Sequence, residues 1–135
     1  MTKLNLKYKG NLQVESTHLN SGEKIFTDAP VDNNGLGRCF SPTDLLANAY
    51  ASCMLTVIGI YCQQNNLDFT RGEVSVEKIM VSNPRRVGKL IVNFDLNGNN
   101  WTKENRQKIE SVAIGCPVAK SINNDIETKI TFEYE

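Results

Sequence analysis

The chain has 135 residues, 40% hydrophobic and 22% charged, which is the composition of one globular domain able to bury a core. Fifteen Lys plus Arg balance fifteen Asp plus Glu, so there is no basic excess for a phosphate backbone, and we expect no nucleic-acid partner. No continuous apolar run reaches the roughly 18 residues of a membrane span, and the alternating start differs from a signal peptide. We therefore expect a single domain over residues 1–135 that is cytoplasmic and does not associate with membranes.

The first forty residues are predicted to be mostly extended. Apolar and polar side chains alternate over residues 4–8 and again over 12–14, with a Gly-Asn turn between them. A second turn at residues 20–22 precedes another extended stretch at 24–27. This pattern predicts an N-terminal three-stranded β-meander, followed by a loop rich in Gly and Asn.

A helix start is encoded at residues 41–44. Ser41 suits the N-cap, Pro42 the first helical position, and Asp44 the third, where its carboxylate completes a capping box. We expect this helix to run to about residue 65. Its apolar residues recur at spacings of three and four and cover too wide a surface for a helix lying on water, which predicts a central helix buried on most sides.

The second half of the chain alternates again between strand and helix patterns. A strand begins at Val74, turns at residues 82–84 and returns through residues 90–96, which predicts a hairpin with a bulge near Lys78. Helical spacing follows over residues 101–114, then a short helical piece ends near residue 123, and a strand closes the chain over 126–134. The sequence predicts one α+β unit.

Cysteines are the candidate reactive residues. In a reducing compartment Cys39, Cys53, Cys62 and Cys116 are more typical of buried thiols, metal ligands or redox centres than of a static disulfide framework. Their spacing contains no CxxC pair and fits no zinc pattern, so we expect no metal. The single His18 borders a turn and is interpreted as a solvated or packing residue.

Two of these thiols form the candidate redox pair. Cys116 precedes Pro117 in an N-cap-like position that could favour its thiolate, or it packs as a small buried hydrophobe. Cys53 lies in the middle of the predicted helix among apolar residues, where burial alone would keep it inert. Cys62 is nine residues further on, on the opposite helix face and roughly 13.5 Å along the axis, too far for a disulfide with Cys53. The distance between Cys53 and Cys116 is left open by the sequence.

Residues 41–53, SPTDLLANAYASC, followed by Cys116-Pro117-Val118, resemble the OsmC/Ohr family of organic hydroperoxide reductases and their relatives. The resemblance covers almost the whole chain. It implies an OsmC-like α+β fold with an N-terminal β-meander, a long central helix, a β-hairpin, a second helix and a C-terminal strand. It also implies an intertwined homodimer with active sites at the subunit interface.

The resemblance further implies the chemistry. Cys53 would attack the peroxide and become a sulfenic acid, and Cys116 would resolve it as a disulfide. A dithiol or a lipoyl-bearing protein would then reduce that disulfide, without any cofactor.

The chain departs from the family in the groups that activate the thiol. A buried thiol needs a positive group or strong donors to ionise, and the resemblance implies an Arg held by a Glu that directly follows the Pro of the helix start. Here Thr43 occupies that place, and Asp44 is the neighbouring acid. Asp44 precedes Cys53 by nine residues, which on an ideal helix is half a revolution, so it serves as a cap unless the first turn bends or the contact crosses the dimer. Residues 27–30, TDAP, stand where classical OsmC proteins place the Arg. Arg38 is the nearest substitute, with a solvated loop arginine as the alternative.

The sequence thus predicts a dimeric cysteine peroxidase that prefers organic over inorganic hydroperoxides. Apolar residues around the helix could line a pocket for an alkyl chain or could pack in the core; they are Phe40, Leu45, Tyr50, Met54 and Val57. The alternative is an OsmC-like dimer with weak or no turnover that binds a small molecule or senses redox state, which the missing Arg/Glu pair favours. A purely structural α+β domain would require the Cys53 and Cys116 motifs to be coincidental. Cys39 and Cys62 match no family motif and are interpreted as incidental thiols.

Overall fold

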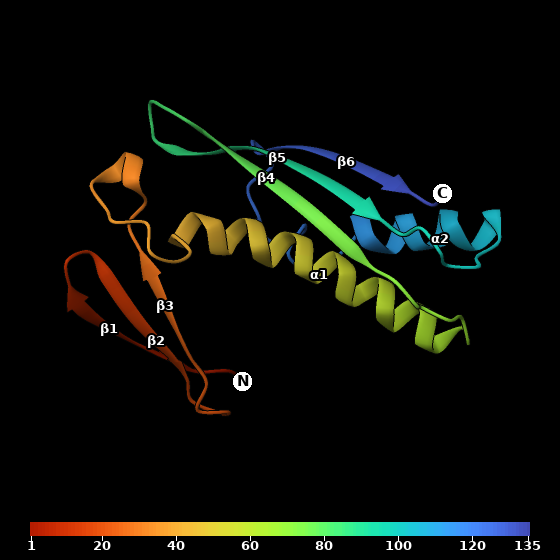
Figure 1. The fold of residues 1–135 in the computed structure, drawn as a ribbon, viewed down its shortest axis with the longest axis horizontal. Helices are drawn as coiled ribbons and strands as arrows, with labels where there is room; N and C mark the ends of the chain where they lie inside the picture. The colour runs from red at the N-terminus through yellow and green to blue at the C-terminus, as the bar shows by residue number, and fades with distance from the viewer. The chain divides into compact units, whose positions relative to one another are not determined.

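In a computed structural model all 135 residues are described, and they form two compact units, residues 1–46 and 47–135. A single domain over the whole chain stays a prediction. Figure 1 labels the helices and strands. In chain order they are β1 (Leu4–Gly10), β2 (Gln13–His18), β3 (Lys24–Asp28), the short 3-10 helix η1 (Val31–Asn33), α1 (Pro42–Gln64), β4 (Glu73–Val81), β5 (Arg86–Asp95), α2 (Lys103–Ile114) and β6 (Glu127–Glu133).

The first unit is the expected meander. Strands β1, β2 and β3 pair antiparallel in chain order, with Leu6 opposite Ser16 and Val14 opposite Thr27. A register shift between Tyr8 and Gly10 accommodates the tight turn into β2. Most of the apolar side chains of this sheet stay exposed, among them Leu4, Leu6, Tyr8, Ile25 and Phe26. The sheet therefore lacks a core of its own.

Helix α1 begins as the sequence predicts. The Ser41 hydroxyl accepts from the Asp44 N–H at 3.0 Å, and the Asp44 carboxylate accepts from the Ser41 N–H at 2.9 Å. This reciprocal pair satisfies two backbone donors that a helix start would otherwise leave without partners, so the capping box is formed. The helix ends at Gln64, within a residue of the predicted end.

The expected burial of α1 on most sides is not found in the single chain. Its fully buried residues are Ala47, Tyr50, Ala51, Met54, Ile58 and Cys62, which repeat at helical spacing and define one side. An 18-residue window of α1 has a mean hydropathy of 1.6, with 33% of it buried, and by length and composition alone α1 could cross a membrane. The sequence was expected to hold no membrane span because it has no continuous apolar run of sufficient length. The apolar residues of α1 are interspersed with Ser and Thr, yet the window still reaches this mean hydropathy. The core helix of a soluble protein passes the same test.

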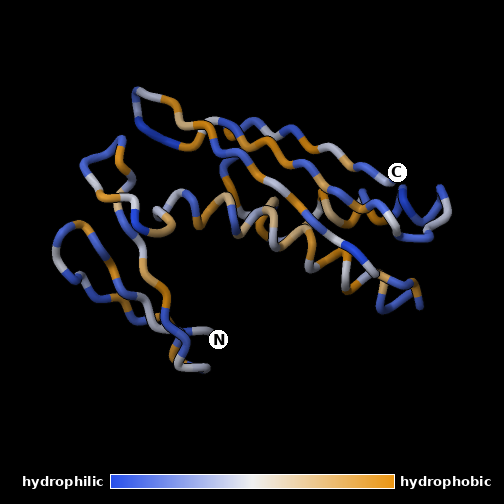
Figure 2. The backbone as a smooth tube through the Cα atoms, viewed as in Figure 1, coloured by the Kyte–Doolittle hydropathy of each residue, from blue (hydrophilic) through white to orange (hydrophobic).

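The second unit holds the core. Strand β4 pairs antiparallel with β5, and β6 pairs parallel with β5 from the other side. The β4–β5 register shifts between Ile79 and Met80, next to the predicted bulge at Lys78. Figure 1 shows α1 and α2 running along this sheet, and in Figure 2 hydrophobic colour marks α1 and alternate positions of the strands. The sheet contributes Val87, Leu90, Val92 and Phe94 to the core, and α2 contributes Ile109 and Ala113.

The region around α2 differs from prediction in two details. Thr102 caps the helix by accepting from the Asn105 N–H at 3.1 Å, so α2 begins at Lys103 rather than at residue 101. Residues 117–123 form turns rather than the expected short helix. The bonds from the Lys120 N–H to the Cys116 carbonyl and from the Ile122 N–H to the Val118 carbonyl are helix-like, but the Ser121 N–H also reaches Val118, three residues back, so no regular helix forms.

Candidate active site

Cys53 and Cys116 lie close together in the second unit. The sequence alone leaves the distance between them open. Cys53 lies in the middle of α1 and is half-buried, whereas Cys116 lies two residues after the end of α2 and is 1% exposed. The Cys116 thiol is hydrogen-bonded to the Cys53 side chain, and the two groups interact electrostatically. Both are free thiols. Two sulfur groups in hydrogen-bonding contact on separate elements are positioned for thiol–disulfide chemistry.

The surroundings of Cys116 oppose its ionisation. Burial raises the pKa of the Cys116 thiol, and the hydrogen bond to Cys53 raises it further. Backbone N–H groups of Ala119 and Val118 lower it, and the Ala119 N–H lies 3.4 Å from Cys116 Sγ. These donors are the N-cap-like feature expected from the sequence. Of the two readings of Cys116, the small buried hydrophobe fits the resting protein, because desolvation outweighs these donors.

Tyr50 and Thr128 lie next to this part of the site, and the sequence did not indicate that they interact. Tyr50 lies three residues before Cys53 on α1 and is 2% exposed. Its side chain is hydrogen-bonded to that of Thr128 on β6 and interacts electrostatically with Cys116. Burial raises the pKa of the Tyr50 phenol. The i, i+3 spacing of Tyr50 and Cys53 was the one signal in the sequence that could have linked them.

Arg38 is held by a partner that sequence analysis missed. Its Nε donates to Asp28 Oδ2 at 2.7 Å, its Nη2 donates to Asp28 Oδ1 at 3.0 Å, and its backbone N–H donates to Oδ2 at 2.9 Å. Asp28 is 1% exposed, while about half of the Arg38 side chain is exposed. The hydrogen bond from Arg38 is the largest cause of a lowered Asp28 pKa, and it raises the pKa of Arg38 in turn. The result is a fixed guanidinium at the surface of residues 1–46.

Asp44 lies in the capping box described above, where its carboxylate accepts from the Ser41 N–H. Asp28, rather than Asp44, is therefore the acid whose contacts to Arg38 the structure records.

The remaining titratable candidates lie elsewhere. Cys62 is buried near the end of α1, and burial raises its pKa, as expected of an inert core thiol. Cys39 is half-buried and interacts electrostatically with Arg38. His18 Nδ1 lies 2.6 Å from the hydroxyl of Ser21 in an exposed turn, which fits its interpretation as a solvated residue.

A groove of about 400 Å³ lies between α1 and α2. Its lining includes Val57, one turn beyond Cys53, and Gly115, the residue before Cys116, but neither thiol itself. The other lining residues are Ile60, Tyr61, Gln64, Ser111 and Val112. Of the residues expected around an alkyl chain, Val57 alone lines this groove. Tyr50 and Met54 are instead buried in the core.

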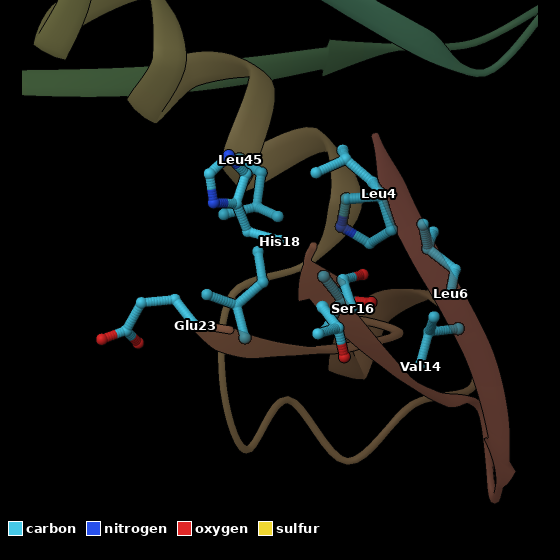
Figure 3. A pocket seen from close by; sticks show the side chains of 11 residues that line it. Leu4, Leu6, Val14, Ser16, His18, Glu23 and Leu45 are labelled. Atoms are coloured by element: carbon cyan, nitrogen blue, oxygen red, sulfur yellow. The ribbon is translucent and has the colours of Figure 1, made fainter. Parts of the chain in front are cut away.

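A second cavity, of about 420 Å³, lies within residues 1–46. Figure 3 shows Leu4, Leu6 and Val14 from the sheet and Leu45 from the start of α1 around it. The lining is apolar apart from a few groups such as His18 and Glu23. An apolar cavity on an open sheet is typical of a surface that another chain or segment covers.

The meander, the long helix with its half-buried cysteine, and the second cysteine after α2 together define a two-thiol α+β protein. The family model for OsmC-like proteins matches residues 35–131. The chain belongs to the OsmC family.

Solved structures agree with this assignment. A protein of Psychrobacter arcticus 273-4, provisionally described as an osmotic stress induced and detoxification response protein, is 41% identical, with 98% of this chain and 96% of that chain covered and a TM-score of 0.92. An organic hydroperoxide resistance protein OsmC from Legionella pneumophila is 20% identical over 98% and 96% of the two chains, with a TM-score of 0.73. An organic hydroperoxide resistance protein of Bacillus subtilis is 20% identical over 98% of both chains, with a TM-score of 0.59. The latter two share the fold. No curated protein matches the chain.

Proposed function

We propose that this protein is a thiol-dependent hydroperoxide reductase that acts through Cys53 and Cys116. The observation that carries the proposal is the hydrogen bond between the buried Cys116 thiol and the Cys53 side chain. The chain belongs to the OsmC family, and some of its structural neighbours are named organic hydroperoxide resistance proteins. Both findings support the same chemistry.

The reaction uses each thiol once. The Cys53 thiolate attacks the outer peroxide oxygen, the O–O bond breaks, and the alkoxide takes a proton and leaves as an alcohol, so that Cys53 becomes a sulfenic acid. Cys116 then attacks the Cys53 sulfur, and the hydroxyl leaves with the Cys116 proton as water. The greater exposure of Cys53 supports its role as the first nucleophile. The raised pKa of Cys116 supports a thiol that waits for the second step.

We assign the activation of Cys53 to Arg38. Its guanidinium is fixed by buried Asp28, while part of the side chain remains exposed and able to face another surface. A fixed positive charge favours a nearby thiolate. Asp44 belongs to the site as the residue that sets the start of α1 through the capping box.

The active form is proposed to be an intertwined homodimer. The N-terminal sheet exposes Leu4, Leu6 and Ile25 around an apolar cavity, and much of apolar α1 is not buried within the chain. Exposed apolar area of this extent is costly in water, and a second copy supplies the matching surface.

The substrate is proposed to be an organic hydroperoxide, with hydrogen peroxide a poorer one. The α1–α2 groove, whose lining includes Val57 one turn beyond Cys53, offers apolar contacts through Val57, Ile60 and Val112 to an alkyl chain. A dithiol or a lipoyl-bearing protein would reduce the disulfide, and the four free cysteines suit a reducing compartment such as the cytoplasm.

The test is steady-state consumption of tert-butyl hydroperoxide with dihydrolipoamide as reductant. Wild-type protein and Cys39→Ser should turn over at equal rates, whereas Cys53→Ser should lose activity entirely. Cys116→Ser should complete one reaction and then overoxidise at excess peroxide. Full activity of Cys53→Ser would contradict the proposal. A wild-type protein whose thiols resist hydroperoxide would instead support the alternative, an OsmC-like binding or redox-sensing dimer.

A further inference from the structure

The backbone around Cys116 forms hydrogen bonds with every polar group of this residue. The Cys116 N–H donates to the Ala113 carbonyl at 3.2 Å, and the Cys116 carbonyl accepts from the Lys120 N–H at 3.2 Å. The Cys116 sulfur accepts from the Ala119 N–H at 3.4 Å. The resolving thiol is therefore fixed by residues that are its neighbours in the chain.

Ser121 fixes the shape of the turn that follows Cys116. Its hydroxyl donates to the Pro117 carbonyl at 2.7 Å, and its N–H donates to the Val118 carbonyl at 2.9 Å. Both bonds tie the end of the turn to its beginning, and Ala119 lies between the tied residues. Ser121 thus helps to hold the Ala119 N–H against the Cys116 sulfur. Because Ser121 is exposed, a substitution there leaves the core intact.

The Cys116 sulfur needs this donor most during resolution. It develops negative charge as it attacks the Cys53 sulfenic acid, and at 1% exposure it receives little help from water. In the resting protein the N–H groups of Ala119 and Val118 already oppose the effect of burial on the Cys116 pKa. A hydrogen bond to a charged acceptor is stronger than one to a neutral acceptor, so the Ala119 N–H stabilises the attacking sulfur more than the resting thiol.

Few titratable groups surround Cys116. Cys53 and Tyr50, both on α1, are the titratable side chains that interact with it. Lys120 is the one charged residue of the turn over residues 117–122, and it is exposed. Substitution of Ser121 changes none of these groups. A displaced pH profile in such a variant therefore reports the backbone donor rather than a neighbouring charge.

We propose that Ser121 is a positioning residue for the resolving step, because its hydroxyl holds the turn that directs the Ala119 N–H at the Cys116 sulfur. The step forms the Cys53–Cys116 sulfur–sulfur bond and breaks the Cys53 sulfur–oxygen bond. The Cys53 sulfur is reduced and the Cys116 sulfur is oxidised, and the departing hydroxyl leaves with the Cys116 proton as water. The inference rests on the proposed function of the two thiols.

The test separates the two half-reactions in single-turnover experiments with tert-butyl hydroperoxide. Dimedone trapping follows the sulfenic acid, and intact mass follows the disulfide. In Ser121→Ala we expect Cys53 oxidation at the wild-type rate but disulfide formation about threefold slower at neutral pH, the loss typical of one hydrogen bond. The pH profile of disulfide formation should move to higher pH, because a sulfur with a weaker donor ionises at higher pH. Ser121→Thr keeps the hydroxyl and should restore both the rate and the profile.

Two further variants complete the design. Ala119→Pro removes the donor itself and should slow disulfide formation about tenfold, with a larger displacement of the profile. Ser121→Ala keeps the inference testable if Ala119→Pro fails to fold. Ser82→Ala, at an exposed position in the turn between β4 and β5, is the matched control and should behave like wild type.

The outcomes distinguish the inference from the proposed function. A wild-type rate and profile in Ser121→Ala would overturn the inference alone. A slower step with an unmoved pH profile would also overturn it, since the turn would then act through packing rather than through its donor. A wild-type protein that forms no Cys53–Cys116 disulfide would overturn the proposed function and this inference together.

Discussion

Arg38 and Asp28 form a two-point ion pair, with Nε to Oδ2 at 2.7 Å and Nη2 to Oδ1 at 3.0 Å. The carboxylate is buried and receives a third hydrogen bond from the Arg38 backbone. A guanidinium held at two points loses little further freedom when it acts on another group. The pair thus turns a loop arginine into a fixed positive charge.

Substitution of Asp28 should release that charge. In Asp28→Asn we expect Cys53 to react with tert-butyl hydroperoxide about tenfold more slowly, since Arg38 then populates several conformations and stabilises the thiolate less often. Stopped-flow measurement of thiol loss gives the rate. Asp125→Asn, an exposed acid in the turn before β6, is the control and should react like wild type. If Asp28→Asn and Arg38→Ala both react at the wild-type rate, Arg38 does not activate Cys53.

The Arg38–Asp28 ion pair also predicts how the stability of the folded protein depends on pH. Because the pKa of Asp28 is lowered in the folded protein, its stabilising contribution is fully present above the ordinary carboxyl pKa and is lost as pH falls through the lowered value. Urea unfolding of the wild type should therefore show a midpoint that declines in this acidic range. Asp28→Asn should have a lower midpoint near neutral pH and a flatter decline. Parallel declines in the two proteins would show that other carboxyl groups control acid stability.

The capping box predicts that Asp44 acts on the helix. Ser41→Ala and Asp44→Ala should each lower the free energy of unfolding by about 1 kcal/mol, because each leaves a backbone donor at the start of α1 without its partner. Asn48→Ala, at an exposed position within α1, should cost nothing. Chemical denaturation measures all three. Should Asp44→Ala keep full stability while losing peroxide reactivity, Asp44 would be a member of the reaction machinery rather than a cap.

The exposed apolar sheet predicts a dimer that a single charge can disrupt. Leu6→Glu and Ile25→Glu place a carboxylate beside the apolar cavity of residues 1–46, where burial by a second copy would leave it unpaired. Sedimentation should find wild type at twice the monomer mass and both variants shifted toward monomer. Asn5→Glu adds the same charge on β1 outside the cavity lining and should remain dimeric. A wild type that sediments as a monomer would contradict the assembly.

The sequence predicted local features well where one residue type has one role. Ser41 and Asp44 specified the helix start, and strict alternation specified the hairpin of β4 and β5. The bulge lay within two residues of Lys78. In each case the deciding interaction is between residues that are neighbours in the chain or in a hairpin.

The features that were missed depend on contacts between distant segments. Asp28 could not be recognised as the partner of Arg38, since the irregular segment between them, with the short η1, has no fixed periodicity. Tyr50 looked like any apolar helix residue, because its partner Thr128 lies on a strand near the end of the chain. For Cys116 the sequence left open whether the backbone donors or burial controls its ionisation, because the extent of its burial depends on packing between distant segments.

The central claim is that a hydroperoxide oxidises Cys53 and Cys116 to a disulfide. Its most direct test is to identify the oxidised cysteines by mass. The reduced protein is mixed with a few equivalents of tert-butyl hydroperoxide, alkylated, weighed intact and mapped by peptide mass. We predict rapid loss of two hydrogen atoms from the protein and one new disulfide, joining Cys53 to Cys116, while Cys39 and Cys62 remain thiols. Four intact thiols, or oxidation confined to Cys39, would contradict it.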